Sequence, residues 1–74
     1  MSLMTKFERT VATHMKNGKD PYVGMHEDAG CPRVVVSAAL GRLQSKGYTK
    51  RVYKKDGVFW EITHEGRRAV DLEP

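Results

Sequence analysis

The segment 31–48, CPRVVVSAALGRLQSKGY, constrains the fold more than any other part of the chain. Its larger apolar residues recur at the three- and four-residue spacing of one buried side of a helix; they are Val36, Leu40, Leu43 and Tyr48, with Ala39 beside them. Pro32 suits a first helical position, and Gly47 suits the left-handed residue just past a helix end. We therefore expect a helix in this segment, with one side packed against the rest of the chain.

The opposite side of this predicted helix carries small residues. Successive residues turn by about 100° around a helix axis. The side that faces away from the apolar stripe is therefore Val34, Ala38, Gly41 and Ser45, flanked by Ser37 and Arg42. We expect this side to be exposed.

A basic hairpin is predicted directly after the helix. Residues 48–54 alternate as a strand does, the Lys-Asp-Gly sequence at 55–57 is a turn signal, and residues 58–63 return as a second strand. Val58, Trp60 and Ile62 lie on one face of the second strand, which we take to be the core face. The hairpin cations are Lys50, Arg51, Lys54 and Lys55.

The residues before the central segment predict two further helices. Met4, Phe7, Val11 and Met15 form one buried stripe, and His14 then falls on or near the solvated side; Thr5-x-x-Glu8 has the capping-box pattern, and Asn17-Gly18 is a natural stop. Asp20-Pro21 is a good opening for a second helix that closes at Gly30. Its helix propensity is poor because Gly24 lies inside it. Tyr22 and Val23 are therefore also candidates for a short strand beside the hairpin.

A last short helix is expected at residues 64–72, with Thr63 as its cap. The chain has no repeat and no linker, so we expect one domain over 1–74. A 74-residue chain with 39% hydrophobic residues can bury only a small core, which weighs against most enzymes. The net charge of +4 favours a polyanionic partner.

The cysteine content and the apolar pattern bear on location. One cysteine cannot form an internal disulfide, so a reducing compartment is the simplest reading. No apolar run approaches the roughly 20 residues that span a bilayer, and MSLMTK has no signal-peptide core. We expect a cytoplasmic protein with no membrane partner.

The order of these motifs resembles a known family. MHEDAGCPRVVVSAALGRLQSKGYTKR is similar to the helix-turn-helix of MarR-like and related winged-helix regulators, and WEITHEG is similar to the family's YxLTxxG after the wing. The resemblance implies an α+β winged helix-turn-helix with the order helix, helix, helix, strand, strand, helix. The helix-turn-helix would cover about 21–46 and the wing about 48–63.

The same resemblance implies binding to double-stranded DNA by a small transcriptional regulator or a phage- or plasmid-type accessory factor. The third helix would enter the major groove and the basic wing would follow the phosphates. The residues that would contact DNA are Arg33, Val34, Ser37, Ala38, Gly41, Arg42, Lys50, Arg51, Lys54 and Lys55. A homodimer through the first or last helix stays open beside a monomer.

One departure from the family keeps an alternative open. Family members usually carry long polar side chains at the centre of the recognition surface, where this chain has only small residues. Such a surface offers few hydrogen bonds to base edges, and it suits packing against a protein helix. The alternative is therefore a winged-helix module for protein–protein interaction. Residues 58–62 are also similar to the tryptophan segment of Z-DNA-binding domains, but Ser37 and Gly41 stand where those domains place asparagine and tyrosine.

Other chemistry has little support in the sequence. Cys31 lies just before a helix start, where thiolates are stabilised, so a redox switch competes there with a small apolar plug in the turn. The histidines show no metal-ligand spacing with this cysteine, and no carboxylate pair has a companion nucleophile or a phosphate-binding loop. We expect no metal, no cofactor and no enzymatic activity.

Overall fold

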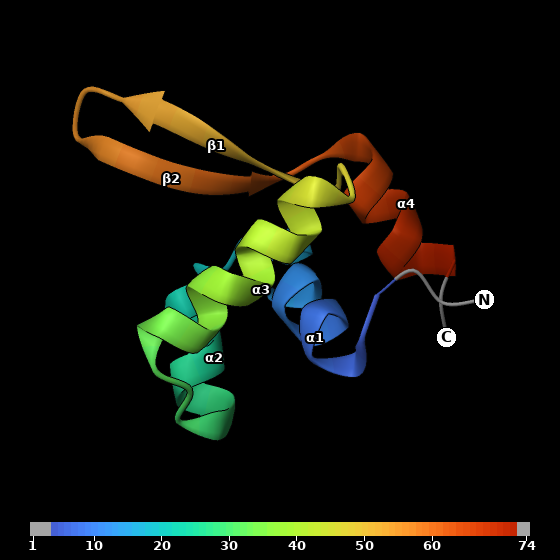
Figure 1. Cartoon of the computed structure of the whole chain (residues 1–74), viewed down its shortest axis with the longest axis horizontal. Coiled ribbons are helices and arrows are strands. Elements are labelled where there is room, and N and C mark those ends of the chain that lie inside the picture. Colours follow the sequence, from blue (N-terminus) through green and yellow to red (C-terminus); the bar gives the residue numbers. More distant parts are fainter. Residues whose placement is uncertain (1–3, 73–74) are drawn as a thin grey trace.

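The structure is a computed structural model that describes residues 4–72. Its elements in chain order are α1 (Lys6–Lys16), α2 (Pro21–Ala29), α3 (Arg33–Ser45), β1 (Thr49–Lys54), β2 (Gly57–Ile62) and α4 (His64–Leu72) (Figure 1). The order confirms the predicted α+β layout, and a two-stranded hairpin after the third helix is consistent with a winged helix-turn-helix. Each strand begins and ends within one residue of its predicted bounds.

Local signals in the sequence set the helix ends. The Thr5 side chain accepts a hydrogen bond from the Glu8 amide while the Glu8 carboxylate accepts one from the Thr5 amide, so the predicted capping box begins α1. The Asp20 carboxylate caps α2, and Gly30 ends it in the left-handed region at φ 63°. Pro32 is the cap of α3, one position before the helical place that we expected for it.

The alternative of a short strand at Tyr22 and Val23 is wrong, because both residues lie in α2 and the sheet has only β1 and β2 within residues 4–72. Gly24 is tolerated there because α2 approaches α1 closely. A Cβ atom at Gly24 would lie 2.7 Å from the ring of His14. His14 lies near the solvated side, as expected, but its ring is largely covered by α2. Its side chain is 17% exposed between the two helices, with Nε2 2.6 Å from Oδ2 of Asp28.

One hydrophobic core joins the helices to the base of the hairpin. Its buried apolar residues are Met4, Val11, Ala12, Met15, Met25, Val36, Ala39, Leu40, Leu43, Tyr48, Ile62 and Val70. The predicted stripes of the first and third helices supply most of them, although Phe7 is only half-buried at the margin. No helix among the described residues is both long and apolar enough to cross a membrane.

The hairpin extends well beyond the helices (Figure 1). Its strands pair antiparallel with Thr49 opposite Ile62 and Lys54 opposite Gly57. The predicted core face of β2 is buried only at the base of the hairpin: Ile62 is buried and Trp60 half-buried, but Val58 is 55% exposed. Val58 is exposed because it lies on the outer half of the hairpin, away from the core that covers the base.

Candidate nucleic-acid interface

The outer side of α3 is not covered by the rest of the described chain. Val34 is 74% exposed, Ser37, Ala38 and Ser45 are exposed, and Gly41 is half-buried. The residues of the opposite side are fully buried in the core. The structure therefore divides α3 as its sequence pattern predicts, and it leaves a surface of small side chains available to a partner.

Arg33 begins α3 and is held on an aromatic ring. Its guanidinium lies 3.9 Å from the centre of the Tyr22 ring, a cation–π arrangement that connects α3 to α2. The hydroxyl of Tyr22 is 2.9 Å from Oγ of Ser37, one turn further along α3. Two predicted contact residues, Arg33 and Ser37, are thus positioned by the same tyrosine.

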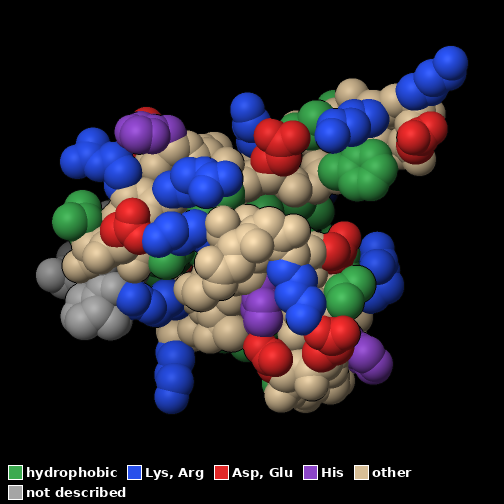
Figure 2. All heavy atoms as spheres, turned by 180° about the vertical axis from the view of Figure 1, so that it is seen from behind, with side chains coloured by type: hydrophobic (Ala, Val, Ile, Leu, Met, Phe, Trp, Pro, Cys, Tyr) green, Lys and Arg blue, Asp and Glu red, His purple; other side chains and the backbone are tan. Residues whose placement is uncertain are grey.

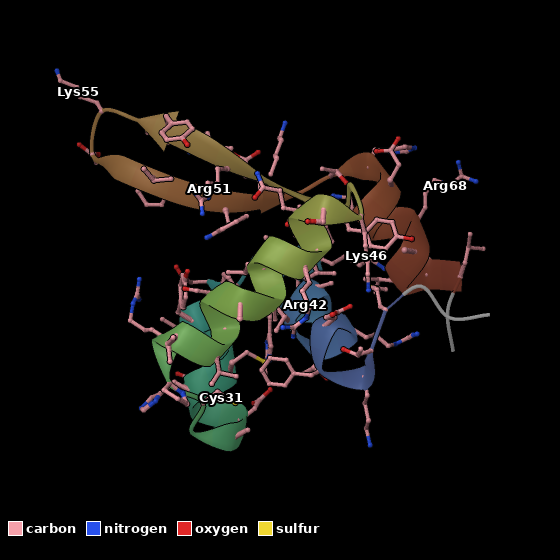
Figure 3. The ribbon with its side chains drawn as sticks, in the orientation of Figure 1. Cys31, Arg42, Lys46, Arg51, Lys55 and Arg68 are labelled. Atoms are coloured by element: carbon pink, nitrogen blue, oxygen red, sulfur yellow. The ribbon has the colours of Figure 1, made fainter. Side chains whose placement is uncertain are left out.

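Arg42 lies on the flank of α3 that faces α1, where the fold already uses its charge. Arg42 Nε donates to Oε2 of Glu8 at 2.7 Å, and Lys46 Nζ donates to Oε1 at 2.6 Å. Both cations point toward α1 in Figure 3. Glu8 is only 1% exposed, so these two cations neutralise a buried carboxylate. The structure places Arg42 first of all in a helix–helix ion pair.

The protonation of Glu8 follows from this cluster. Burial alone would raise the pKa of the Glu8 carboxyl, since it disfavours the charged form. Hydrogen bonds from Lys46, from Arg42 and from the Thr5 amide outweigh burial and lower the pKa below its usual value. Glu8 therefore stays ionised and keeps α3 fixed against α1.

The hairpin cations lie on two different faces. Because side chains alternate along a strand, Arg51 shares a face with its cross-strand partner Trp60, whereas Lys50 and Lys54 share the other face with Phe59. The Arg51 guanidinium is 5.0 Å from the Trp60 ring, and Figure 3 shows it between the hairpin and α3. Lys54 Nζ is 5.5 Å from the Phe59 ring. Lys55 lies in the turn, at the far tip.

The structure thus brings some of the predicted residues together and separates others. Arg33 begins α3 and Arg51 lies between the hairpin and α3 in Figure 3, and each is stacked on an aromatic ring. Lys50 and Lys54 project from the opposite face of the hairpin, and Arg42 is directed toward α1. Apart from Arg42 and Lys46, which bind Glu8, the predicted contact cations closest to α3 are therefore Arg33 and Arg51.

Sequence reasoning missed the two aromatic platforms. The Arg51–Trp60 pair could have been found, since a turn at residues 55–56 places these two residues opposite each other. The Tyr22–Arg33 pair had no such signal, because it depends on how α2 packs against α3.

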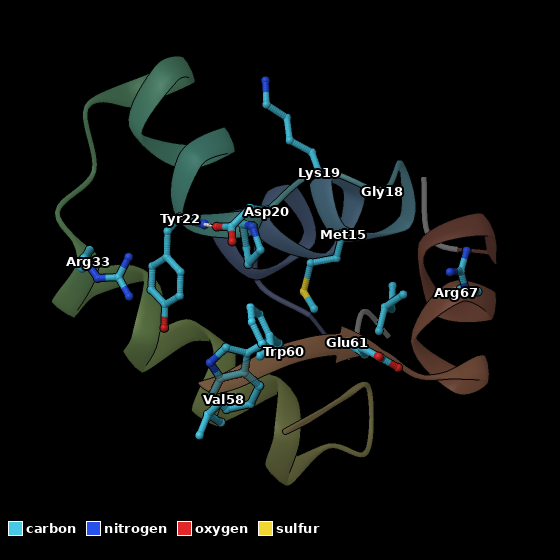
Figure 4. Close-up of a pocket in the computed structure, with 13 residues that line it drawn as sticks. Met15, Gly18, Lys19, Asp20, Tyr22, Arg33, Val58, Trp60, Glu61 and Arg67 are labelled. Atoms are coloured by element: carbon cyan, nitrogen blue, oxygen red, sulfur yellow. Dashed lines mark hydrogen bonds between the residues drawn. The ribbon is translucent and has the colours of Figure 1, made fainter. Parts of the chain in front are cut away.

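Tyr22, Arg33 and Trp60 also line a cavity of about 420 Å³, together with Met15, Pro21 and Ile62 (Figure 4). From behind, a recess separates the hairpin from the helical body (Figure 2).

The two other kinds of site considered from the sequence were a redox switch at Cys31 and a metal site. Cys31 is half-buried in the α2–α3 connection and packs against the core, as a small apolar plug would. Within residues 4–72, no group of three or more histidine, cysteine, aspartate or glutamate side chains is placed to hold a metal ion.

Comparison of the chain with family models, with curated proteins and with solved structures finds no match.

Proposed function

We propose that this protein binds double-stranded DNA, with the exposed side of α3 in the major groove and the hairpin against the adjoining backbone. The observation that carries the proposal is the pair Arg33 and Arg51, two guanidinium groups held on aromatic rings beside an uncovered helix surface. Arginine suits this place because its planar, permanently charged group contacts phosphate oxygens or a guanine edge with two donors. The protein would act as a small transcriptional regulator or an accessory factor of phage or plasmid type, in the cytoplasm.

The small side chains of α3 determine what kind of binding this is. Val34 and Ala38 can contact thymine methyl groups, and Gly41 lets the backbone approach closely, but these residues offer few base-edge hydrogen bonds. Affinity would then come chiefly from phosphate contacts, with Lys54 and Lys55 contributing from the outer hairpin. Such binding depends steeply on salt and weakly on sequence.

The test is a titration of a fluorescent duplex of random sequence, measured by anisotropy at several salt concentrations. The double variant R33A/R51A should bind about tenfold more weakly at low salt, and the slope of log affinity against log salt should fall by roughly 2. The control is K6A/R68A, which removes the same charge from the exposed Lys6 of α1 and Arg68 of α4. Equal losses of duplex affinity in both variants would show that only the net charge matters, and the proposed DNA-binding surface would be refuted.

Exposed apolar residues on α3 support a second candidate, a protein-interaction module. Val34 is 74% exposed and Val35 42%, and a protein helix would cover both better than a nucleic-acid groove would. This candidate predicts that wild-type protein and R33A/R51A bind the duplex equally weakly. The titration above therefore separates the two candidates.

A further inference from the structure

We infer that the outer edge of β2 is a docking site for an extended, acidic peptide segment of a partner protein, which would add a third strand to the sheet. The site is the cavity between β2 and the turn from α1 to α2, lined by Lys19 and Tyr22 on one side and by Val58 and Trp60 on the other (Figure 4). This inference goes beyond DNA binding and does not depend on it.

The hydrogen-bond pattern of the hairpin shows which groups face the cavity. The Thr63 amide donates to the carbonyl of Tyr48, directly opposite it, at 2.9 Å. Hydrogen-bonded pairs alternate with non-bonded pairs along an antiparallel ladder. The main-chain groups of Val58, Trp60 and Ile62 therefore point away from β1, toward the open edge.

These edge groups have no partner within residues 4–72. The backbone hydrogen bonds outside the helices and the β1–β2 ladder include none from or to Val58, Trp60 or Ile62, and no side chain bonds to them. From Val58 to Ile62 the edge measures about 14 Å at 3.4 Å per residue, enough for a peptide of about five residues. An unpaired edge of this length is a ready template for another strand.

The cavity has the size and the lining of a binding site. Its volume of about 420 Å³ falls within the usual range for ligand sites, and Tyr22 and Trp60 supply aromatic walls. Aromatic side chains beside an exposed strand edge give a bound peptide both main-chain hydrogen bonds and pockets for alternate side chains.

The charged residues around the cavity indicate what kind of peptide would bind there. Of the charged residues around the cavity, Lys19 is paired with Glu27, and the Asp20 carboxylate accepts the amides of Tyr22 and Val23. The other charged lining residues of the described chain are Arg33, Arg67 and Glu61, none of which belongs to an ion pair there. Figure 4 shows Arg33 and Arg67 at opposite sides of the cavity. A peptide with an apolar centre and an acidic residue near each end would match them.

The experiment uses two-dimensional amide NMR of the full chain. The probe is an end-blocked peptide, Glu-Val-Tyr-Val-Thr-Val-Glu, added up to about 1 mM. We expect saturable shifts centred on the amides of Val58, Trp60 and Ile62. Methylating two alternate backbone nitrogens of the peptide should weaken binding about tenfold, because each methyl group removes a strand hydrogen bond. Replacing both glutamates of the peptide with lysine should also weaken binding about tenfold, because lysine would repel Arg33 and Arg67.

A matched pair of protein variants tests the charge argument. R67E should weaken peptide binding several-fold, whereas R68E, the same change at the next residue of α4, should not. The inference fails if the N-methylated peptide binds as well as its parent, if the shifts centre on Val34 and Ala38 on the outer side of α3, or if R67E and R68E behave alike. It also fails if oligothymidylate shifts the same amides and displaces the peptide, since the site would then be a stacking surface for single-stranded nucleic acid.

Discussion

Replacing Glu8 with glutamine tests how α3 is held against α1. Glutamine keeps the shape of the side chain but removes its charge, and its amide group can accept from only one of the two cations that the carboxylate binds. A hydrogen bond to a charged group contributes about 1.5–3 kcal/mol when buried. Arg42 is 52% exposed and Lys46 35%, so water screens both and each bond contributes about 1 kcal/mol.

The neutral side chain also costs less to bury, which offsets part of this loss. The lowered pKa of Glu8 indicates that the hydrogen bonds outweigh burial, so the net effect is destabilising at neutral pH. We expect E8Q to lose about 1–2 kcal/mol of unfolding free energy. In a domain of this size, that loss lowers Tm by roughly 5–15 °C.

The assay is urea and thermal unfolding, followed by the fluorescence of Trp60. E65Q, which removes the charge of an exposed glutamate in the first turn of α4, should stay within about 0.5 kcal/mol of the parent. Because the folded pKa of Glu8 lies below its unfolded value near 4.5, the unfolded chain binds the proton more readily as the pH falls past that value. The stabilisation is therefore full at pH 7 and disappears as the pH falls through the folded pKa.

The difference between the parent and E8Q should accordingly shrink toward zero in acid. Equal stability of the two proteins at pH 7 would refute the reasoning. So would a difference that does not shrink as the pH is lowered below 4.5, the value for the unfolded chain.

Three further substitutions test the local geometry, each by thermal unfolding. G66A should destabilise by about 2–3 kcal/mol, because its Cβ would lie 2.2 Å from the carbonyl oxygen of Tyr48. G41A should stabilise by about 0.5–1 kcal/mol, since its Cβ meets nothing within 4 Å and alanine is the better helix former; a loss of stability would contradict the open space beside Gly41. D20A should cost about 1 kcal/mol, because it removes the acceptor for the amides of Tyr22 and Val23; an unchanged Tm would show that water replaces the cap.

Patterns local in sequence predicted most of the fold. Thr5 and Glu8, Asp20, and Gly30 act where we expected them because a cap depends on residues within one helical turn. The stripe of Leu40 and Leu43 predicted the buried side of α3, since helical geometry fixes which residues share a side.

Interactions between elements account for what the sequence left undetermined. Glu8 was assigned only a capping role, because its charge partners Arg42 and Lys46 are far from it in the chain and meet it only when α1 packs on α3. His14 is a similar case, since a glycine in another helix makes room for its ring. Of the candidate interface, the positions on α3 followed from periodicity, but the division of the hairpin cations between two faces required the strand register.

The two sides of α3 have different freedom to change. The inner side is fixed by the core and by the Glu8 cluster, while Val34 and Ala38 on the outer side are exposed. Substitutions at these outer positions can therefore accumulate without unfolding the protein. The same backbone could carry different outer side chains, so α3 is a suitable place on which to design a new binding surface.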